Sequence, residues 1–392
     1  MKRLKVAVVS LSDGIWDPRV LRLSTTLANA GFQVTQYGFP TNEPMPTLVN
    51  WKYTEIKPNP VSISRERLRR NRLAMFFGTK KVASSEWLLR ILPKDLDAAL
   101  ENSEADIFVA MDYTLLPTLF NTTKRNGGVV CYEAREYYQG QNHKSRIWRM
   151  YMPRIVREIE GKHINDCAIV TTVSFGISDL LYRDYSMEVR PEVIYGFPEE
   201  TTPSIKMPRT PTNLVFHGNL SSDREIDRFI RFFDFEKSNV NLLIRGNGSE
   251  DYIDLLVEII KSKGLNSRVK LEEAVSKIDL LEATSKNHFG LIPWRNHFPQ
   301  KKYSMPNKFF EYLSAGLPVI CTVGSELAEI VETHKIGLVF NYSEIGALES
   351  KLMLLHDDEY IRMQKNVQKY LVENGFWLQQ SKLISLYSKL HN

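Results

Sequence analysis

The stretch SMPNKFFEYLSAGLPVIC (residues 304–321) predicts a short helix that runs into an apolar strand. Ser304 is of the residue type that caps a helix start, and Gly316 followed by proline is a common helix end. Lys308 and Glu311 are three residues apart, so they share one face of the first turns. The partial positive charge of a helix start and the Lys308 ammonium suit a phosphate, and the Glu311 carboxylate can accept ribose hydroxyls. The alternative is an ordinary surface ion pair between Lys308 and Glu311.

On both sides of this stretch, short apolar runs alternate with helical patterns, which predicts an α/β fold with parallel sheets. The chain has 392 residues, more than one hydrophobic core usually serves, so two domains are expected. A Pro-rich segment with little periodicity is the natural linker. The predicted organisation is a Rossmann-like domain over 1–195, a linker over 196–212, a second Rossmann-like domain over 213–375 and a C-terminal helix over 376–392 that is a candidate to pack back on the first domain.

Local signals place individual elements. Asp17 followed by Pro18 is a favoured helix start, after a strand over 5–10. The segment 41–60 is Pro-rich and is predicted to be irregular, whereas 224–237 is predicted to be one helix. Charged and aromatic residues gather where predicted strands end, which is where open α/β sheets bind ligands.

Two glycine-containing loops follow the first two strands of the second half. Glycine lets a backbone approach a phosphate closely, and nearby cations offset its charge. Each loop alone is weak evidence, because strand-to-helix turns need glycine in any case. The residues concerned are Gly218, Asn219 and Arg224 in the first loop, and Arg245, Gly246 and Gly248 in the second.

Composition narrows the class of protein. Hydrophobic residues make up 43% and charged residues 25%, as in ordinary globular proteins. Three widely spaced cysteines favour a reducing compartment, and the histidines include no H-x-x-x-H pair. No metal site is therefore predicted. No run is long enough to span a membrane, so we expect a cytoplasmic protein, with the inner face of the cell membrane as a candidate location.

The positive charge is concentrated in residues 61–94, which contain nine Lys and Arg residues but only two Glu residues. A solvated cationic face of a helical hairpin and a surface for anionic lipid or a lipid-phosphate acceptor explain this window equally well. A nucleic-acid partner is not expected, because the window lacks the interleaved aromatics of a known module.

The motifs together resemble the donor-binding domain of GT-B glycosyltransferases, most closely the large family 4 of retaining enzymes. Residues 306–320 are similar to its subgroup signature P-x-K-x-x-E-Y-L-A-x-G-x-P-V-I, and 217–224 to its G-R-L…K motif. In the first half, residues 17–22 resemble the D-P-R-V-x-R opening, and 133–136 occupy the D-x-H-E site. The implied fold is GT-B, two Rossmann-like domains that face a central cleft.

The resemblance also implies residue roles. The donor would be a UDP- or GDP-sugar, with Glu311 on its ribose and Lys308 and Arg224 on its diphosphate, and no cofactor would be needed. Arg135 and Glu136 would line the sugar or acceptor pocket as catalytic residues. The remaining donor-binding candidates are Asp13, Gly14, Gly218, Asn219, Arg245, Gly246, Gly248, Ser304 and Asn307, with Ala274 and Val275 near the base. Asp112 and Tyr113 are acceptor-binding candidates.

Three positions depart from the family pattern. Tyr303 stands where the Glu-x7-Glu motif has its first acid, Asn219 replaces an Arg, and Arg135 replaces a His. The implied function is transfer of a hexose or N-acetylhexosamine to a lipid-linked or polymeric glycan in bacterial cell-surface polysaccharide synthesis. Three alternatives remain: a nucleotide-sugar epimerase or phosphorylase, a non-catalytic glycan-binding partner, and a glycosidase that uses two of Asp112, Glu133 and Glu136.

Overall fold

The computed structural model describes residues 3–58, 80–141, 146–202 and 211–391, so most of the basic window 61–94 lies outside the described residues. The chain divides into two compact units. The first comprises Met1–Ile194 and Gln380–Asn392, and the second Tyr195–Gln379. The assignment of acceptor binding to the first and donor binding to the second stays a prediction.

The first unit contains a seven-stranded sheet in the order β3-β2-β1-β4-β5-β6-β7, with every pairing parallel. Its strands are β1 (Lys5–Val9), β2 (Gln33–Gly38), β3 (Trp51–Glu55), β4 (Ile107–Ala110), β5 (Val129–Ala134), β6 (Ile169–Thr172) and β7 (Glu192–Val193). Its helices are α1 (Pro18–Asn29), α3 (Lys80–Ile91), α4 (Leu96–Glu101), α5 (Leu116–Asn126), α6 (Arg146–Glu160) and α7 (Phe175–Asp184), together with the end of α17 (Phe376–Ser388).

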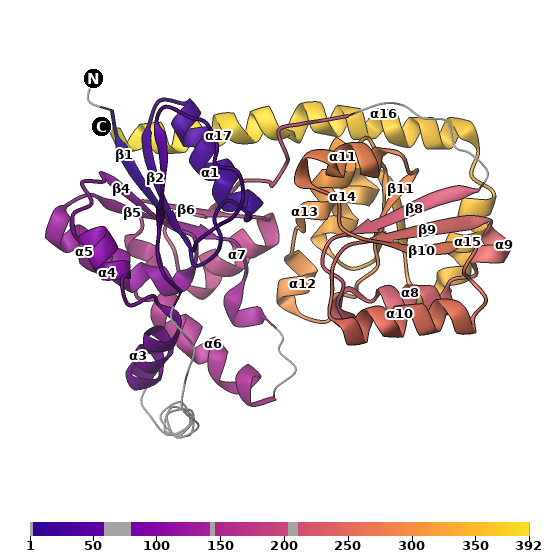
Figure 1. Cartoon of the computed structure of the whole chain (residues 1–392), viewed down its shortest axis with the longest axis horizontal. Helices are drawn as coiled ribbons and strands as arrows, with labels where there is room; N and C mark the ends of the chain where they lie inside the picture. Colours follow the sequence, from indigo (N-terminus) through magenta and orange to yellow (C-terminus); the bar gives the residue numbers. More distant parts are fainter. Residues whose placement is uncertain (1–2, 59–79, 142–145, 203–210, 392) are drawn as a thin grey trace. The chain divides into compact units, whose positions relative to one another are not determined.

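The helices cover both faces of this sheet. In Figure 1, α1 and the end of α17 lie on one side of it, and α4 and α5 lie on the other. Leu383 and Tyr387 of α17 belong to the same buried cluster as Val6, Val109 and Leu27. The last helix of the chain is thus part of the core of the first unit.

The second unit contains a six-stranded parallel sheet in the order β10-β9-β8-β11-β12-β13. Its strands are β8 (Thr212–His217), β9 (Val240–Arg245), β10 (Val269–Glu272), β11 (Phe289–Ile292), β12 (Val319–Thr322) and β13 (Gly337–Phe340). Its helices are α8 (Ile226–Phe232), α9 (Phe235–Ser238), α10 (Glu250–Ser262), α11 (Lys277–Ser285), α12 (Pro299–Tyr303), α13 (Asn307–Ser314), α14 (Glu326–His334), α15 (Ile345–Met353) and α16 (Asp357–Asn374).

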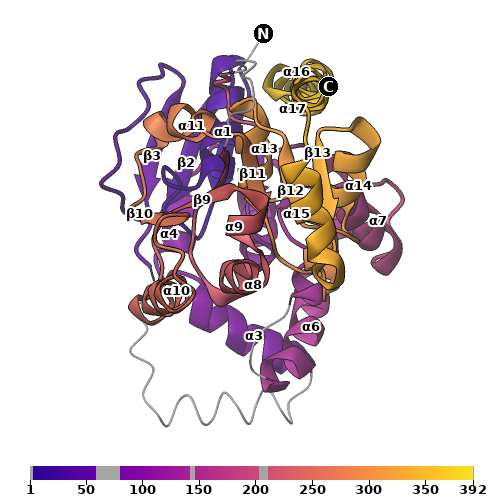
Figure 2. The same ribbon diagram turned by 90° about the vertical axis from the view of Figure 1, so that its right-hand side faces the viewer.

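The helices α8 and α10 lie on one side of the second sheet, and α11, α13 and α14 lie on the other (Figures 1 and 2). In both sheets the strand order reverses next to the first strand, at β1/β4 and at β8/β11. Loops at the carboxyl ends of the strands on either side of such a switch point diverge and leave room for a ligand. The α/β class with two parallel sheets, predicted from sequence, is confirmed.

Two details of the predicted elements are wrong. Residues 51–55 form the edge strand β3, which pairs along β2 although its Pro-rich surroundings suggested a loop. The predicted helix over 224–237 is broken, because Glu225 is left-handed (φ 55°) and Phe233 is extended (ψ 134°). By contrast, Asp17 accepts hydrogen bonds from the Arg19 and Val20 amides and caps α1 as predicted.

Candidate functional site

The start of α13 carries Lys308 and Glu311. The helix begins at Asn307 after an extended Pro306, and Ser304 ends α12 instead of capping α13. The prediction that Ser304 caps α13 was wrong. Nothing in the sequence marks α12 as a separate short helix that ends at Tyr303, just before Ser304. Lys308 is only 8% exposed and its ammonium lies 3.7 Å from the centroid of the Phe216 ring, so the surface ion-pair alternative is also wrong.

The Lys308 ammonium is unusual among buried cations. Within the described part of the chain it lies over aromatic rings and makes no hydrogen bond or ion pair within 4 Å. Burial lowers the pKa of Lys308 well below its usual value, and the nearby Arg224 guanidinium lowers it further, while the Glu311 and Asp223 carboxylates oppose the change. A buried cation that lacks an oxygen partner is stabilised when an anion arrives.

The Glu311 carboxylate contacts the imidazole of His217, a residue of strand β8. Its Oε2 lies 2.8 Å from Nε2 of His217, the last residue of β8, and Nδ1 of the same ring lies 3.2 Å from the Thr284 hydroxyl. The Glu311 side chain is 20% exposed and that of His217 is 4% exposed. Sequence reasoning missed this role of His217, because 94 residues separate it from Glu311 and no local pattern links them.

The two glycine loops pack against each other. The Gly218 amide donates to the Arg245 carbonyl (2.9 Å), and the Leu220 amide donates to the Asn247 carbonyl (2.8 Å). A Cβ on Gly246 would lie 1.9 Å from the Gly218 carbonyl oxygen. Gly246 is therefore required by the neighbouring loop.

The other two glycines of these loops differ in what they face. A Cβ on Gly248 would lie 2.4 Å from the Leu220 carbonyl oxygen, so this glycine too is required by loop packing. Among the described residues other than Gly218 and its chain neighbours, the atoms within 4 Å of a Cβ on Gly218 (φ 109°) belong to the Lys308 side chain, with Nζ at 3.7 Å. Of the three predicted glycines, only Gly218 is exposed and faces Lys308.

Two arginines that the sequence singled out retain unused donors. Arg245 is buried, and its Nη2 lies 2.6 Å from a Glu272 oxygen. Among the described residues its Nε and Nη1 have no hydrogen-bond partner, and neither has the Nε of Arg224. Arg224 sits in the short 3-10 turn Ser222–Arg224, not inside a helix as predicted. Guanidinium donors without acceptors are expected where a polyanion binds.

Trp294 and Lys301 are functional candidates that the sequence did not reveal. Trp294 follows β11 and is 4% exposed, and three cations lie within 6 Å of its ring: Arg224 at 5.1 Å, Lys301 at 5.8 Å and Lys308 at 5.8 Å. Burial lowers the pKa of Lys301, and the Asp223 carboxylate, 3.8 Å away, opposes this. We refer to Arg224, Lys301 and Lys308 as the cation cluster.

The remaining predicted donor residues of the second unit lie at the same carboxyl edge of its sheet. Asn219 is exposed and its amide donates to the Ser221 hydroxyl at 3.3 Å. Asn307 is the exposed first residue of α13. Ala274 and Val275 lie in the connection from β10 to α11, where the Ser276 hydroxyl caps the helix by accepting from the Asp279 amide. The contacts of the described residues do not test the predicted role of Ala274 and Val275 near the base, which stays a prediction.

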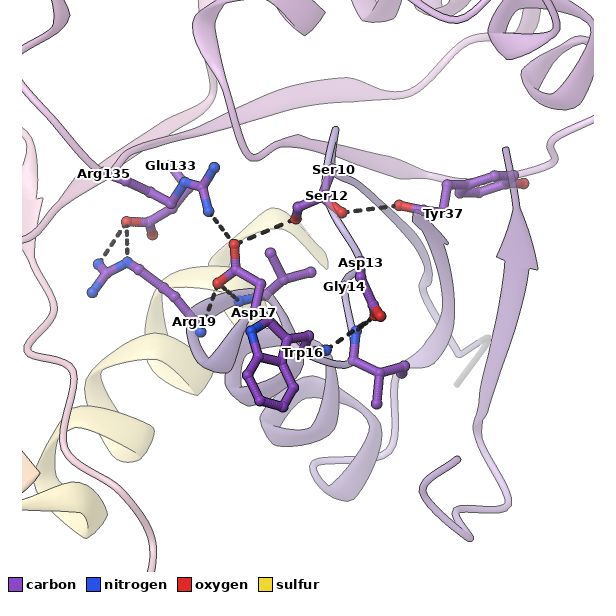
Figure 3. A network of polar contacts seen from close by, with 12 residues as sticks. Ser10, Ser12, Asp13, Gly14, Trp16, Asp17, Arg19, Tyr37, Glu133 and Arg135 are labelled. Carbon is purple, nitrogen blue, oxygen red and sulfur yellow. Dashed lines mark hydrogen bonds and ion pairs between the residues drawn. The ribbon is translucent and has the colours of Figure 1, made fainter. Parts of the chain in front are cut away.

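In the first unit, the loop after β1 is fixed by its own side chains. Asp13 Oδ1 accepts from the Ile15 and Trp16 amides, both at 3.0 Å (Figure 3). Gly14 is buried, and a Cβ there would lie 2.3 Å from the Gln36 amide nitrogen. Both predicted residues thus have a structural reason for their identity in addition to the predicted contact with a donor.

Two ion pairs join α1 to the end of β5 (Figure 3). Arg135 pairs with Asp17, whose other carboxylate oxygen caps α1, and Arg19 Nη2 lies 2.5 Å from Glu133. Glu133 is 2% exposed and also accepts from the Thr171 hydroxyl at 2.5 Å. This carboxylate is therefore a buried structural partner of Arg19 and is no candidate for a glycosidase pair.

The other three predicted residues of this unit lie nearby. Glu136 accepts a hydrogen bond from the Gln141 side chain. Asp112 Oδ1 accepts from the Thr114 amide (2.9 Å) and hydroxyl (2.6 Å), so it caps the turn after β4. Tyr113 is 5% exposed and its hydroxyl bonds the Trp87 indole nitrogen at 3.0 Å. These contacts hold the turn, and they leave the predicted acceptor contacts as predictions.

Two Rossmann-like units with these parallel sheets define the GT-B fold, the fold of a large class of glycosyltransferases. Solved structures of that fold match nearly the whole chain at low identity. A sucrose-phosphate synthase from Thermosynechococcus elongatus has a TM-score of 0.72 at 13% identity over 99% of both chains. A glycosyltransferase from Rickettsia africae has a TM-score of 0.68 at 13% identity over 100% of both chains. The HepE protein of Anabaena, solved with UDP and glucose, has a TM-score of 0.67 at 12% identity over 99% of this chain and 100% of that chain.

A family model matches part of the second half. Residues 244–383 match the family described as glucosyltransferase 3-like, C-terminal domain. Glucosyltransferase 3 of Streptococcus parasanguinis is 29% identical over 119 residues, which cover 28% of this chain and 35% of that protein. The aligned part thus spans about a third of the length of the curated relative.

Among the described residues, no group of three His, Cys, Asp or Glu side chains is arranged to hold a metal ion. No helix in the described ranges is both long and apolar enough to cross a bilayer.

Proposed function

We propose that this chain is a glycosyltransferase that moves a hexose or N-acetylhexosamine from a UDP- or GDP-sugar to a glycan acceptor. The observation that carries the proposal is the buried Lys308 ammonium, which has no oxygen partner among the described residues and lies one helical turn from the His217-bound Glu311. This pairing suits a ligand that presents a diphosphate beside a ribose. The similarity to glucosyltransferase 3 and the GT-B fold support the same class.

The cation cluster suits the reaction chemically. When a sugar leaves a nucleoside diphosphate, negative charge accumulates on the departing phosphate while the anomeric carbon becomes cationic. Lys308, Arg224 and Lys301 supply preorganised positive charge around the buried Trp294 ring. Charge so placed stabilises the transition state more than the ground state. We therefore propose that these side chains promote departure of the diphosphate without a metal ion.

The finer features of the proposal rest on the family resemblance. They are a retaining outcome, a lipid-linked or polymeric acceptor, a role in bacterial cell-surface polysaccharide synthesis and a location in the cytoplasm at the inner face of the membrane. The basic window 61–94 is the proposed membrane or acceptor contact. Arg135 and Glu136 are the proposed catalytic residues, with Asp13, Gly14, Asp112 and Tyr113 as further contacts to substrate.

Two other functions fit the fold less well. A nucleotide-sugar epimerase of this architecture is expected to place acids and histidines around the sugar, and the Arg135–Asp17 ion pair offers a neutralised pair instead. A non-catalytic glycan-binding partner would have no use for a cation cluster around a buried lysine.

A panel of nucleotide sugars tests the proposal. Thermal melting should rise with one or a few UDP- or GDP-sugars, because a ligand of the native state stabilises it. Calorimetry should then show weaker UDP or GDP binding for Lys308→Ala and Glu311→Ala, and unchanged binding for Lys351→Ala, an exposed lysine of α15. Unchanged nucleotide affinity in both site variants would reject the assignment.

A further inference from the structure

We propose that His217 is a positioning residue that fixes the Glu311 carboxylate for the ribose hydroxyls, and that it thereby makes the site selective for ribonucleotides over 2′-deoxyribonucleotides. The inference rests on the proposed function, since it assigns a second residue to the same nucleotide site. It concerns selectivity of binding and adds no chemical step.

His217 is held both through its backbone and through its ring. Its backbone amide donates to the Tyr312 hydroxyl at 3.1 Å, and its ring lies 4.6 Å from the Tyr312 ring, centroid to centroid. Thr284 of α11, which is fully buried, contacts Nδ1 at 3.2 Å. With only 3% of the residue exposed, the imidazole has no room to rotate.

The partners also define the tautomer. An ionised carboxylate only accepts hydrogen bonds, so in the 2.8 Å contact Nε2 carries a proton and donates a hydrogen bond to Glu311. Nδ1 then accepts from the Thr284 hydroxyl, which can donate. The Thr284 hydroxyl is thus compatible with the ring form that donates to Glu311, and the carboxylate is the partner that selects this form.

The fixed ring limits the freedom of Glu311. A glutamate side chain has three rotatable bonds, and that of Glu311 is 20% exposed, so each contact that holds its carboxylate reduces the number of rotamers it can adopt. With Oε2 anchored on a buried imidazole, the carboxylate is oriented before a ligand arrives. A polar site that is preorganised for a hydroxyl rejects the analogue that lacks it more strongly than a mobile one does.

The test measures calorimetric dissociation constants for UDP, 2′-deoxy-UDP, GDP and 2′-deoxy-GDP with the full chain. We expect the wild type to prefer the ribo form of the diphosphate that it binds. His217→Leu should weaken binding of the ribo form about tenfold, the size expected for the loss of one hydrogen bond to a charged group, and should bring the ribo-to-deoxy ratio close to one. His217→Gln, which keeps a donor near the Nε2 position, should retain an intermediate ratio.

Further variants separate positioning from a general effect on folding. Thr284→Val should lower the ribo-to-deoxy ratio less than His217→Leu does, and His217→Leu should have no additional effect on that ratio in a Glu311→Ala background. Thermal melting identifies variants that fail to fold. If His217→Leu does not fold, the Thr284→Val and His217→Gln ratios decide.

The outcomes distinguish two failures. A wild-type ratio that persists in His217→Leu, or in both other variants where that one does not fold, would overturn the inference and leave the proposed function standing. A wild type that binds neither UDP nor GDP, or binds ribo and deoxy forms equally, would overturn the ribose site itself.

Discussion

The Lys308 ammonium lies 3.7 Å from the centre of the Phe216 ring, and a Cβ on the exposed Gly218 would lie 3.7 Å from the same Nζ. A π face is a weaker partner for an ammonium than a phosphate oxygen. Lys308 is thus kept desolvated, with its pKa depressed chiefly by burial, at a position where a diphosphate would stabilise its charged form.

Binding of UDP or GDP should be coupled to proton uptake by Lys308. The free-state pKa is lowered, and a bound diphosphate raises it, so protons are taken up at pH values between the two. Calorimetry in alkaline buffers of different ionisation enthalpy measures this uptake. Lys308→Arg, which stays charged throughout, should abolish the buffer dependence, and the same buffer dependence in both proteins would contradict the assignment.

The cation cluster should act on the diphosphate and not on the nucleoside. Lys301→Ala and Arg224→Ala should each weaken UDP or GDP binding about tenfold, because each removes a charge-assisted contact, while uridine or guanosine binding stays unchanged. The exposed neighbour Lys302 is the control, and Lys302→Ala should have little effect. Equal losses for nucleoside and diphosphate would place the cluster elsewhere on the ligand.

Gly246→Ala should destabilise the protein more than Gly264→Ala. Both glycines have positive φ, 151° and 68°, so both substitutions cost about 1 kcal/mol in backbone strain. At Gly264 an added Cβ has no other described residue within 4 Å apart from its chain neighbours, whereas at Gly246 it meets the Gly218 carbonyl oxygen at 1.9 Å. We expect a loss of about 2–4 kcal/mol for Gly246→Ala from this added steric conflict. Urea denaturation gives both values, and equal losses would show that the loops separate easily.

Glu160 should make stability depend on pH. It is fully buried between the Tyr132 and Tyr185 hydroxyls, each 2.6 Å from one of its oxygens. Burial raises the pKa of Glu160 to about 7, against the opposing effect of these hydrogen bonds. Since the unfolded pKa is about 4.3, the stability that the bound proton gives is complete below that pH and is lost as pH rises through about 7.

The variant Glu160→Gln cannot titrate and should lack this decline. The difference in free energy of unfolding between variant and wild type should therefore shift in favour of the variant by up to about 3 kcal/mol from pH 4 to pH 8. Urea titrations across that range measure it. Parallel curves for the two proteins would mean that Glu160 stays ionised in the folded state.

Arg135→Ala should leave UDP and GDP affinity unchanged and lower the turnover of the sugar donor. Arg135 belongs to the first unit and pairs with Asp17, so its loss also leaves that carboxylate without this cation. Asp17 keeps its second oxygen on the α1 amides, so the helix cap survives. Steady-state kinetics with the identified donor would show the effect, with the exposed Arg183→Ala as control. A drop in nucleotide affinity would move Arg135 into the donor site.

The sequence predicted more of the architecture than of the candidate site. Asp17 and Pro18 mark the start of α1 through purely local chemistry, and the structure has the helix where they place it. The break at Glu225 was not foreseen, because a left-handed glutamate leaves no local signal. It is held by Arg295, whose Nε lies 2.9 Å from the carboxylate and which comes 70 residues later.

The same limit applies to the candidate site. Lys308 and Glu311 could be recognised because they share one short helix. Trp294, Lys301 and His217 could not be recognised in this way. They come close to that helix only when β8, β11 and α12 have folded around it. Side-chain partners distant in the chain are visible only after folding.

The placement of Leu383 and Tyr387 in the core of the first unit bears on the order in which the chain is completed during translation. Tyr195–Gln379 is one uninterrupted segment, whereas the first unit needs residues that leave the ribosome after that segment. Domains usually finish folding in the order of their synthesis. Here we expect the second unit to be completely synthesised before the first. The core of the first unit lacks Leu383 and Tyr387 until α17 has been made.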